Sequence, residues 1–218
     1  MAYEPQQPRR RQRRAETTAE QLLQAARTVF ETRGYQAATV GTITKAASTA
    51  HGTFYLYFRN KQDAFAKVME DAVTRMYQEA QAPWAAHPRD ALRVALSGFL
   101  QVFADHRGLW RALIEGALQD AEIEKMWMEL RRPFVERIER LLERNRQASL
   151  IRDELDTTVA AHALGSMVEW FAFAHYALGE PGEDRVPQDR VVDGLVDVWL
   201  HAAFAGTLAP AAVPALDR

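Results

Sequence analysis

The 218-residue sequence contains no cysteine, which excludes disulfide bridges, thiolate zinc sites and thiol redox sensing. Signatures of catalysis and metal binding are also missing. There is no G-x-S-x-G, no glycine-rich phosphate loop, and no H-x-x-x-H or E-x-x-H pair among the six histidines. We therefore expect no cofactor and no metal. An enzyme remains possible only if the fold brings distant side chains together.

A long uninterrupted apolar segment is also missing. The most membrane-like stretch, Val159 to Gly179, is interrupted by His162, Glu169 and His175. Glu169 at its centre would cost about 2.5–3.5 kcal/mol on insertion scales. The N-terminus is rich in arginine, but no apolar segment follows it, so it is not a secretory signal. These features predict a soluble, cytoplasmic protein without membrane contact.

Charge is distributed unevenly along the chain, although the net formal charge is only −2. Residues 1–67 contain eleven Lys/Arg and five Asp/Glu, a formal charge of +6, whereas the remaining 151 residues carry −8. A basic N-terminal part followed by an acidic remainder is typical of a protein that binds phosphate groups with one end. Chance segregation is the alternative, and the motif inside the basic part disfavours it.

That motif is a pair of short helical patterns with a tight polar joint. Thr39 can cap the first helix, and Ser48 to Ala50 form the joint. The second helix is expected over His51 to Phe58. Asn60 then starts a third helix, and Asp63 suits the positively charged end of that helix. A helix, a short turn and a helix form the layout that presents the second helix to the DNA major groove.

The rest of the chain predicts helices only. A T-x-x-Q capping box starts the first helix at Thr18, and Gly34 is a natural stop. Gly108 is expected to stop a later helix, while Pro133 should bend or interrupt a long one and open a cavity near Phe134. No strand-like alternation is present, so the fold class is all-α. The expected helices after the motif cover 60–80, 89–105, 109–118, 122–147, 156–178 and 188–205.

The N-terminal arm and the domain boundaries follow from the same patterns. Residues 1–15 are predicted to be a disordered basic arm. The arm could follow the DNA backbone or enter a minor groove, or it could be a solvated tail, and both interpretations stay open. The predicted domains are a DNA-binding domain at 16–62, a ligand-binding and dimerisation domain at 63–206, and a disordered tail at 207–218.

The segment GTFYLYFRNKQDAF, which begins at Gly52, resembles the tetracycline-repressor (TetR) family of bacterial regulators. Thr39-Val40 and Arg33-Gly34-Tyr35 extend the resemblance, which spans roughly Thr17 to Phe65. It implies a three-helix DNA-binding head joined to a helical body that binds a ligand and dimerises. In two positions the chain departs from the family.

Ser48 stands where the family usually has glycine, and Ala50 stands where it usually has serine or a similar cap. A serine can still make the turn, and Thr49 can take over as the cap.

The predicted DNA contacts combine the resemblance with side-chain chemistry. The resemblance puts base and phosphate contacts near His51 and Thr53, and a solvent-exposed role remains the alternative for His51. Tyrosine hydroxyls can bind phosphates, and a lysine at a helix N-terminus attracts them. The predicted set is Arg13, Arg14, Thr39, Thr49, His51, Gly52, Thr53, Tyr55, Tyr57 and Lys61. Leu56 could touch a thymine methyl group or simply pack.

The body is similar to actinobacterial members of the family, and the member that it resembles in particular has a long, largely apolar tunnel. Similarity is carried by FLQVFADHRG (99–108), the segment 127–134, MVEW (167–170) and Trp199. It implies a lipophilic small-molecule effector, although the same aromatic residues could be ordinary core. The implied lining is Leu92, Phe99, Phe103, Trp127, Phe134, Gly165, Val168, Glu169, Phe173 and Trp199.

The last two long helices are apolar around more than one stripe, which predicts burial against a second subunit. In the family, these two helices form a four-helix dimer interface. The leading hypothesis is thus a homodimeric repressor that binds a pseudo-palindromic DNA operator and is released by a lipophilic effector. The alternatives are a helical scaffold whose head meets a protein partner and an enzyme acting in the bundle cavity.

Overall fold

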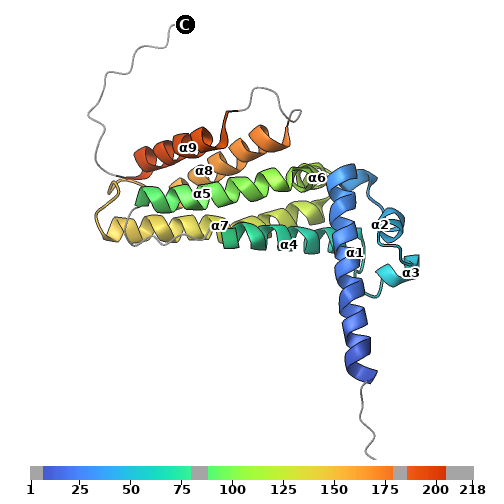
Figure 1. Cartoon of the computed structure of the whole chain (residues 1–218). Helices are drawn as coiled ribbons and strands as arrows, with labels where there is room; N and C mark the ends of the chain where they lie inside the picture. Colours follow the sequence, from blue (N-terminus) through green and yellow to red (C-terminus); the bar gives the residue numbers. More distant parts are fainter. Residues whose placement is uncertain (1–6, 80–87, 179–185, 205–218) are drawn as a thin grey trace, which may run out of the picture.

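The computed structural model describes residues 7–79, 88–178 and 186–204, and all regular elements in these ranges are helices (Figure 1). An isolated bridge between Ile151 and Phe204 is the sole β-type pairing among them. The all-α prediction is confirmed. The helices are α1 (Gln7–Ala37), α2 (Val40–Ala46), α3 (His51–Phe54), α4 (Lys61–Glu79), α5 (Pro88–Asp105), α6 (Arg107–Ala117), α7 (Ala121–Gln147), α8 (Thr157–Ala172), the π-helix η1 (Phe173–Ala177) and α9 (Gln188–Ala203).

The molecule has a head and a long helical body. Figure 1 shows α1 standing across the end of the body, with α2 and α3 on its outer side and the body helices running away from it. Phe30, Phe54 and Phe65 are fully buried in the head, and the rings of Phe30 and Phe65 meet edge to face at 4.7 Å. Because α4 begins in the head and extends along the body, it connects the two parts.

Helix α1 begins at Gln7, eleven residues before the predicted start at Thr18. The described part of the predicted disordered arm is therefore helical. No glycine or proline occurs between Arg9 and Arg33, and the segment is rich in Arg, Gln, Ala and Glu, which favour helix. Pro8 lies in the first turn, where proline is tolerated. The side chains of residues 7–15, which include Arg13 and Arg14, lie outside the described part of the structure, as does the predicted tail at 207–218.

Two glycines set how α1 meets α6. Gly34 has φ +76°, so it breaks the regular helix as predicted. Beyond it, the backbone N–H groups of Tyr35 and Gln36 donate to the carboxylate of Glu115 at 2.9 and 3.2 Å. Gly108 was predicted to be a stop, but it lies in the first turn of α6. A Cβ atom there would come within 2.3 Å of the Glu31 carbonyl oxygen, so Gly108 permits close contact with α1.

The body helices largely follow their predicted ranges. Helix α7 continues through Pro133, so the helix is not interrupted there, and a bend at Pro133 stays a prediction. A proline removes one helical hydrogen bond without necessarily ending the helix. Helix α8 begins at the predicted cap, since Asp156 accepts from Thr158 and Val159 N–H. It then passes into η1, which the sequence did not predict. In the described ranges, no helix is long and apolar enough to cross a membrane.

Candidate nucleic-acid interface and effector cavity

Local caps position the two helices of the motif. Thr39 and Thr42 form a reciprocal capping box at the start of α2, as predicted for Thr39. Ser48 takes the left-handed conformation (φ 52°) that explains glycine at this position in the family. Ala50 is the N-cap of α3 and provides no side-chain bond. Thr49 does not take over as the cap, because its hydroxyl is buried without a partner among the described residues.

The second helix of the motif is shorter than predicted. Regular helix ends at Phe54, and hydrogen bonds from Leu56 N–H to Thr53 O (3.2 Å) and from Tyr57 N–H to Phe54 O (3.0 Å) continue it as turns. The reason is tertiary packing, since Phe54 and Phe58 are both buried and their ring centroids lie 5.2 Å apart. Turning tightly after Phe54 places both rings in the same core.

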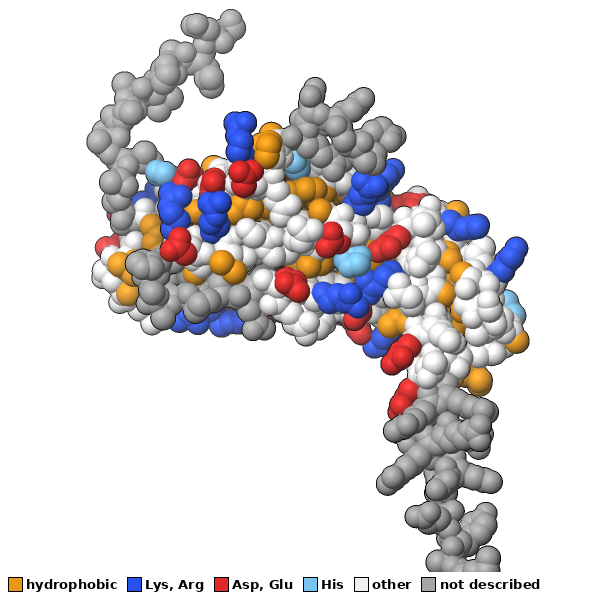
Figure 2. All heavy atoms as spheres, viewed as in Figure 1, with side chains coloured by type: hydrophobic (Ala, Val, Ile, Leu, Met, Phe, Trp, Pro, Cys, Tyr) orange, Lys and Arg blue, Asp and Glu red, His pale blue; other side chains and the backbone are white. Residues whose placement is uncertain are grey.

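This packing leaves one face of the motif free. His51, Gly52, Tyr55 and Leu56 are exposed, with 54% of Tyr55 and 78% of Leu56 accessible, while Thr53 and Tyr57 are half-buried. In Figure 2, histidine, basic and apolar side chains share this outer end of the head. Of the predicted contacts in this segment, the structure therefore exposes His51, Gly52 and Tyr55 and partly covers Thr53 and Tyr57.

Lys61 is placed differently from the prediction. Its ammonium group donates to the Tyr35 carbonyl oxygen at 2.9 Å and lies 4.1 Å from the centre of the Tyr35 ring. Burial lowers the pKa of Lys61, against the opposing effect of Asp120 and Glu115. The predicted cap is confirmed, since Asn60 accepts from the Asp63 N–H at 2.8 Å. A phosphate contact by Lys61 remains a prediction, and it requires the ammonium group to turn away from Tyr35.

Asp120 joins the head to the body. One carboxylate oxygen caps α7 by accepting from the Glu122 N–H at 3.0 Å. The other accepts from the Tyr35 hydroxyl at 2.9 Å and from the Gln62 amide at 3.2 Å. Burial acts to raise the pKa of Asp120, but these hydrogen bonds outweigh it and lower the pKa below its ordinary value. No local sequence pattern predicts this junction, because its residues come from distant segments.

A second polar junction lies deeper between α1, α4 and the corner before α6. Arg27 is buried and pairs with Asp71. His106 lies beside it: its Nδ1 is 2.9 Å from Glu31 and its Nε2 is 3.5 Å from the Arg27 guanidinium. This geometry fits an Nδ1–H that donates to Glu31 and an Nε2 that accepts from Arg27. Head and body are therefore joined by hydrogen bonds and ion pairs as well as by apolar packing.

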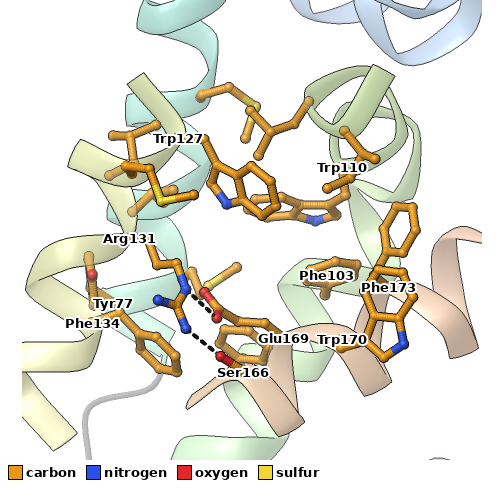
Figure 3. Close-up of a pocket in the computed structure, with 18 residues that line it drawn as sticks. Tyr77, Phe103, Trp110, Trp127, Arg131, Phe134, Ser166, Glu169, Trp170 and Phe173 are labelled. Carbon is orange, nitrogen blue, oxygen red and sulfur yellow. Dashed lines mark hydrogen bonds and ion pairs between the residues drawn. The ribbon is translucent and has the colours of Figure 1, made fainter. Parts of the chain in front are cut away.

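A cavity of about 390 Å³ lies inside the body between α4, α5, α6, α7 and α8 (Figure 3). Its wall is largely aromatic and aliphatic. Phe103 and Trp110 stack with their centroids 4.7 Å apart, and Phe99 and Phe134 stack at 5.5 Å. The lining residues are Met69, Val73, Met76, Tyr77, Phe99, Phe103, Trp110, Leu113, Ile114, Trp127, Met128, Leu130, Arg131, Phe134, Ser166, Glu169, Trp170 and Phe173.

One side of this cavity is polar. Figure 3 shows Arg131 reaching from α7 to Glu169 and Ser166 of α8. The guanidinium donates to Glu169 and to the Ser166 hydroxyl, both at 2.7 Å. Burial raises the pKa of Glu169 even though Arg131 acts to lower it. A carboxylate buried in an apolar helix is costly without a partner, and Arg131 is the partner of Glu169.

Most of the predicted ligand contacts lie at a cavity. Phe99, Phe103, Trp127, Phe134, Glu169 and Phe173 line the large one. Val168 lines a neighbouring cavity of about 190 Å³, which shares Met76, Tyr77, Phe99 and Phe134 with it. Neither lining includes Leu92, Gly165 or Trp199, so a ligand contact at these three residues stays a prediction that the two cavities do not support. Leu92 and Trp199 are buried core residues, and Gly165 gives room to the Phe134 ring, which a Cβ atom would approach to 3.2 Å.

Other lining residues were missed, notably Tyr77, Trp110 and Arg131. In the sequence, the tyrosine and the tryptophan look like ordinary members of apolar helix stripes. The arginine is one of many charged residues on a long helix. The buried Tyr77 hydroxyl and Trp110 N–H have no hydrogen-bond partner among the described residues. Within those residues, no group of three or more His, Asp or Glu is placed to hold a metal ion.

The raised pKa of Glu169 predicts a pH-dependent effect on stability. Because burial favours the neutral carboxyl, the contribution of Glu169 to the stability of the fold is fully present below its ordinary pKa of 4.5. This contribution is lost as the pH rises through the pKa that Glu169 has in the folded protein. Relative to wild type, Glu169→Gln should therefore become progressively more stable as the pH rises from about 4.5. Urea unfolding of both proteins at several pH values measures this difference. A difference in stability that does not vary with pH would contradict the raised pKa of Glu169.

Comparisons with known families agree with this geometry. Residues 22–68 match the model of the tetR family of bacterial regulatory proteins. Residues 92–205 match the model of the C-terminal domain of the transcriptional regulator EthR. The chain is 25% identical to the EthR regulator of Mycolicibacterium smegmatis over 190 residues, 86% of each protein. It is 26% identical over 153 residues to the fatty acid metabolism regulator protein of Bacillus subtilis, covering 68% of this chain and 78% of that protein.

Solved structures share the fold. FadR, a fatty acid degradation regulator from Bacillus halodurans, superposes with a TM-score of 0.69 at 23% identity, covering 84% of this chain and 94% of that one. SmeT, the repressor of a Stenotrophomonas maltophilia multidrug efflux pump, gives 0.68 at 22% identity, covering 90% and 95%.

A helix-turn-helix head on a helical body of this kind defines a DNA-binding transcriptional regulator. The EthR-type match covers more than half of the chain, so the chain belongs to the TetR family and has an EthR-type C-terminal domain. Like the relatives named above, it is a regulator of transcription and not an enzyme.

Proposed function

We propose that the protein is a homodimeric repressor that binds a pseudo-palindromic DNA operator through residues 51–58 and is released by a lipophilic effector in the body. The observation that carries this proposal is the exposed face of His51, Tyr55 and Leu56 on the second helix of a helix-turn-helix. Half-sites one helical turn apart in successive major grooves would match the twofold symmetry of a dimer. The division proposed is a DNA-binding domain at 16–62 and a body at 63–206.

The outer faces of α8 and α9 support dimerisation. Val159 and Trp170 on α8 are each 63% exposed, and Ala163 and Ser166 lie between them at helical spacing. On α9, Val198 is half exposed, and a Cβ atom added at Gly194 would meet nothing within 4 Å. Large apolar side chains beside open, small positions suit close packing against the same helices of a second copy.

The composition of the cavity supports a lipophilic, uncharged effector. Arg131 and Glu169 neutralise each other, so a charged ligand would have to separate this pair, whereas a neutral one would leave it intact. The remaining wall is rich in aromatic rings. The unpaired Tyr77 hydroxyl and Trp110 N–H favour an effector with hydrogen-bond acceptors, because unpaired buried donors are costly.

Fluorescence anisotropy with DNA from the upstream region of the gene tests the DNA-binding part. We expect sequence-selective binding that weakens steeply with salt. A Tyr55→Ala, Lys61→Ala variant should bind about tenfold or more weakly and show a smaller salt slope. A matched Arg140→Ala, Leu150→Ala variant, which changes exposed body residues, should bind like wild type.

Binding equal to that of scrambled DNA, at the upstream region and across a genome-wide search, would reject the proposal. It would favour a head that meets a protein partner. Equal affinity of both double variants would instead remove Tyr55 and Lys61 from the interface.

A further inference from the structure

We propose that Leu56 reads the C5-methyl group of a pyrimidine in the major groove and thereby specifies one position in each operator half-site. This inference rests on the proposed DNA-binding function and adds a specificity-determining residue to it. Leu56 is 78% exposed and stands beside Tyr55 and His51 on the free face of the motif.

The position of Leu56 is fixed by the turn that follows α3. Its N–H donates to Thr53 O at 3.2 Å, and the Phe58 N–H donates to Phe54 O at 2.9 Å. The buried rings of Phe54 and Phe58 anchor the segment on the opposite side. The exposure of Leu56 therefore results from the anchored backbone, and the alternative that Leu56 simply packs in the core is excluded.

The chemistry of the major groove identifies what this side chain meets. Base edges there present hydrogen-bond donors and acceptors, and the one apolar feature is the methyl group on C5 of thymine. A leucine side chain cannot pair with a donor or acceptor, so placing it against any other edge would desolvate a polar group without compensation. Tyr55 and His51, which are 5.6 Å apart between ring centres, supply the polar contacts around it. Leu56 thus selects a methylated C5 position, which either thymine or 5-methylcytosine provides.

The test uses full-length protein and a duplex recovered by selection from a randomised DNA pool. Each thymine is replaced in turn by uracil, which removes only the methyl group, and each cytosine by 5-methylcytosine, which adds it. Burying one methyl group contributes about fourfold in affinity. Loss of the methyl at one thymine in each half-site should therefore weaken wild type about fifteenfold in a duplex changed at both. If affinity instead rises when one cytosine in each half-site is replaced by 5-methylcytosine, the methyl group that Leu56 reads is that of 5-methylcytosine.

Leu56→Ala should lose this sensitivity to the methyl group and bind the uracil and thymine duplexes equally. Its salt slope should equal that of wild type, because no phosphate contact is removed. Leu118→Ala is the matched control: Leu118 is 81% exposed in the body, and its variant should retain the wild-type profile. The inference is overturned if Leu56→Ala keeps the methyl sensitivity, or if neither scan changes wild-type affinity. If wild type selects no sequence from the pool, the proposed function itself fails.

Discussion

Replacing Gly108 by alanine is expected to destabilise the protein by about 1–3 kcal/mol, the usual range for overpacking a tight contact. The new Cβ atom would lie 2.3 Å from the Glu31 carbonyl oxygen and 2.9 Å from the Glu31 Cα and carbonyl carbon. These are backbone atoms in α1, so no side-chain rotation relieves the clash. Helices α1 and α6 must move apart, which weakens the junction between head and body.

Urea denaturation of the Gly108→Ala variant measures this effect. Gly41→Ala is the matched control, since Gly41 is also helical and its nearest neighbour would lie 3.8 Å from the new Cβ atom. The control should be neutral or more stable by up to about 1 kcal/mol, because alanine favours helix more than glycine does. Equal stability of the two variants would show that α1 and α6 do not meet as closely as described.

Tyr35→Phe is expected to cost about 1.5 kcal/mol, the lower end of the range for a hydrogen bond to a charged group, since Asp120 is partly exposed. The substitution keeps the ring that packs 5.1 Å from Phe65 and beneath Lys61, and it removes only the hydroxyl that donates to Asp120. Asp120 can still cap α7, so the helix should remain intact.

The stability difference between wild type and Tyr35→Phe should depend on pH at both ends. Burial, together with Asp120, raises the pKa of Tyr35 above 10.0, so its contribution is present below pH 10 and is lost as the pH rises beyond it. The pKa of Asp120 is lowered below 3.8, so the contribution is also lost as the pH falls below that value. Urea unfolding across this range should show the largest difference between about pH 4 and 10. A constant difference would mean that the hydroxyl contributes no hydrogen bond to a charged carboxylate.

The elements that the sequence predicts well are those determined by neighbouring residues. Thr39, Asn60 and Asp156 cap the helices that follow them because each bonds to a backbone N–H two or three residues on. The apolar stripes likewise predict most helix ranges, since their period follows from helix geometry alone. The all-α fold and the helix-turn-helix could therefore be anticipated in detail.

Contacts between distant segments could not be anticipated in this way. Asp120 and Tyr35 are 85 residues apart, and Arg27 and Asp71 are 44 apart, so no local pattern links them. The end of α3 was missed for a related reason, because the core position of Phe58 overrides the local preference for helix. A cavity near Phe134 was expected from Pro133, and its aromatic lining from the resemblance to the family. The inward direction of Arg131, however, depends on the packing of α7 against α8.

The wall shared by the two cavities would limit the size of the effector proposed above. It is made of Met76, Tyr77, Phe99 and Phe134, of which the methionine is unbranched and adaptable and the phenylalanines can turn about two bonds. A ligand that rotates these side chains gains the second compartment without moving a helix. For the effector proposed above, such an adaptable wall would suit a chemical series of increasing chain length rather than one molecule of fixed size. A regulator with such a cavity would respond to a class of related compounds.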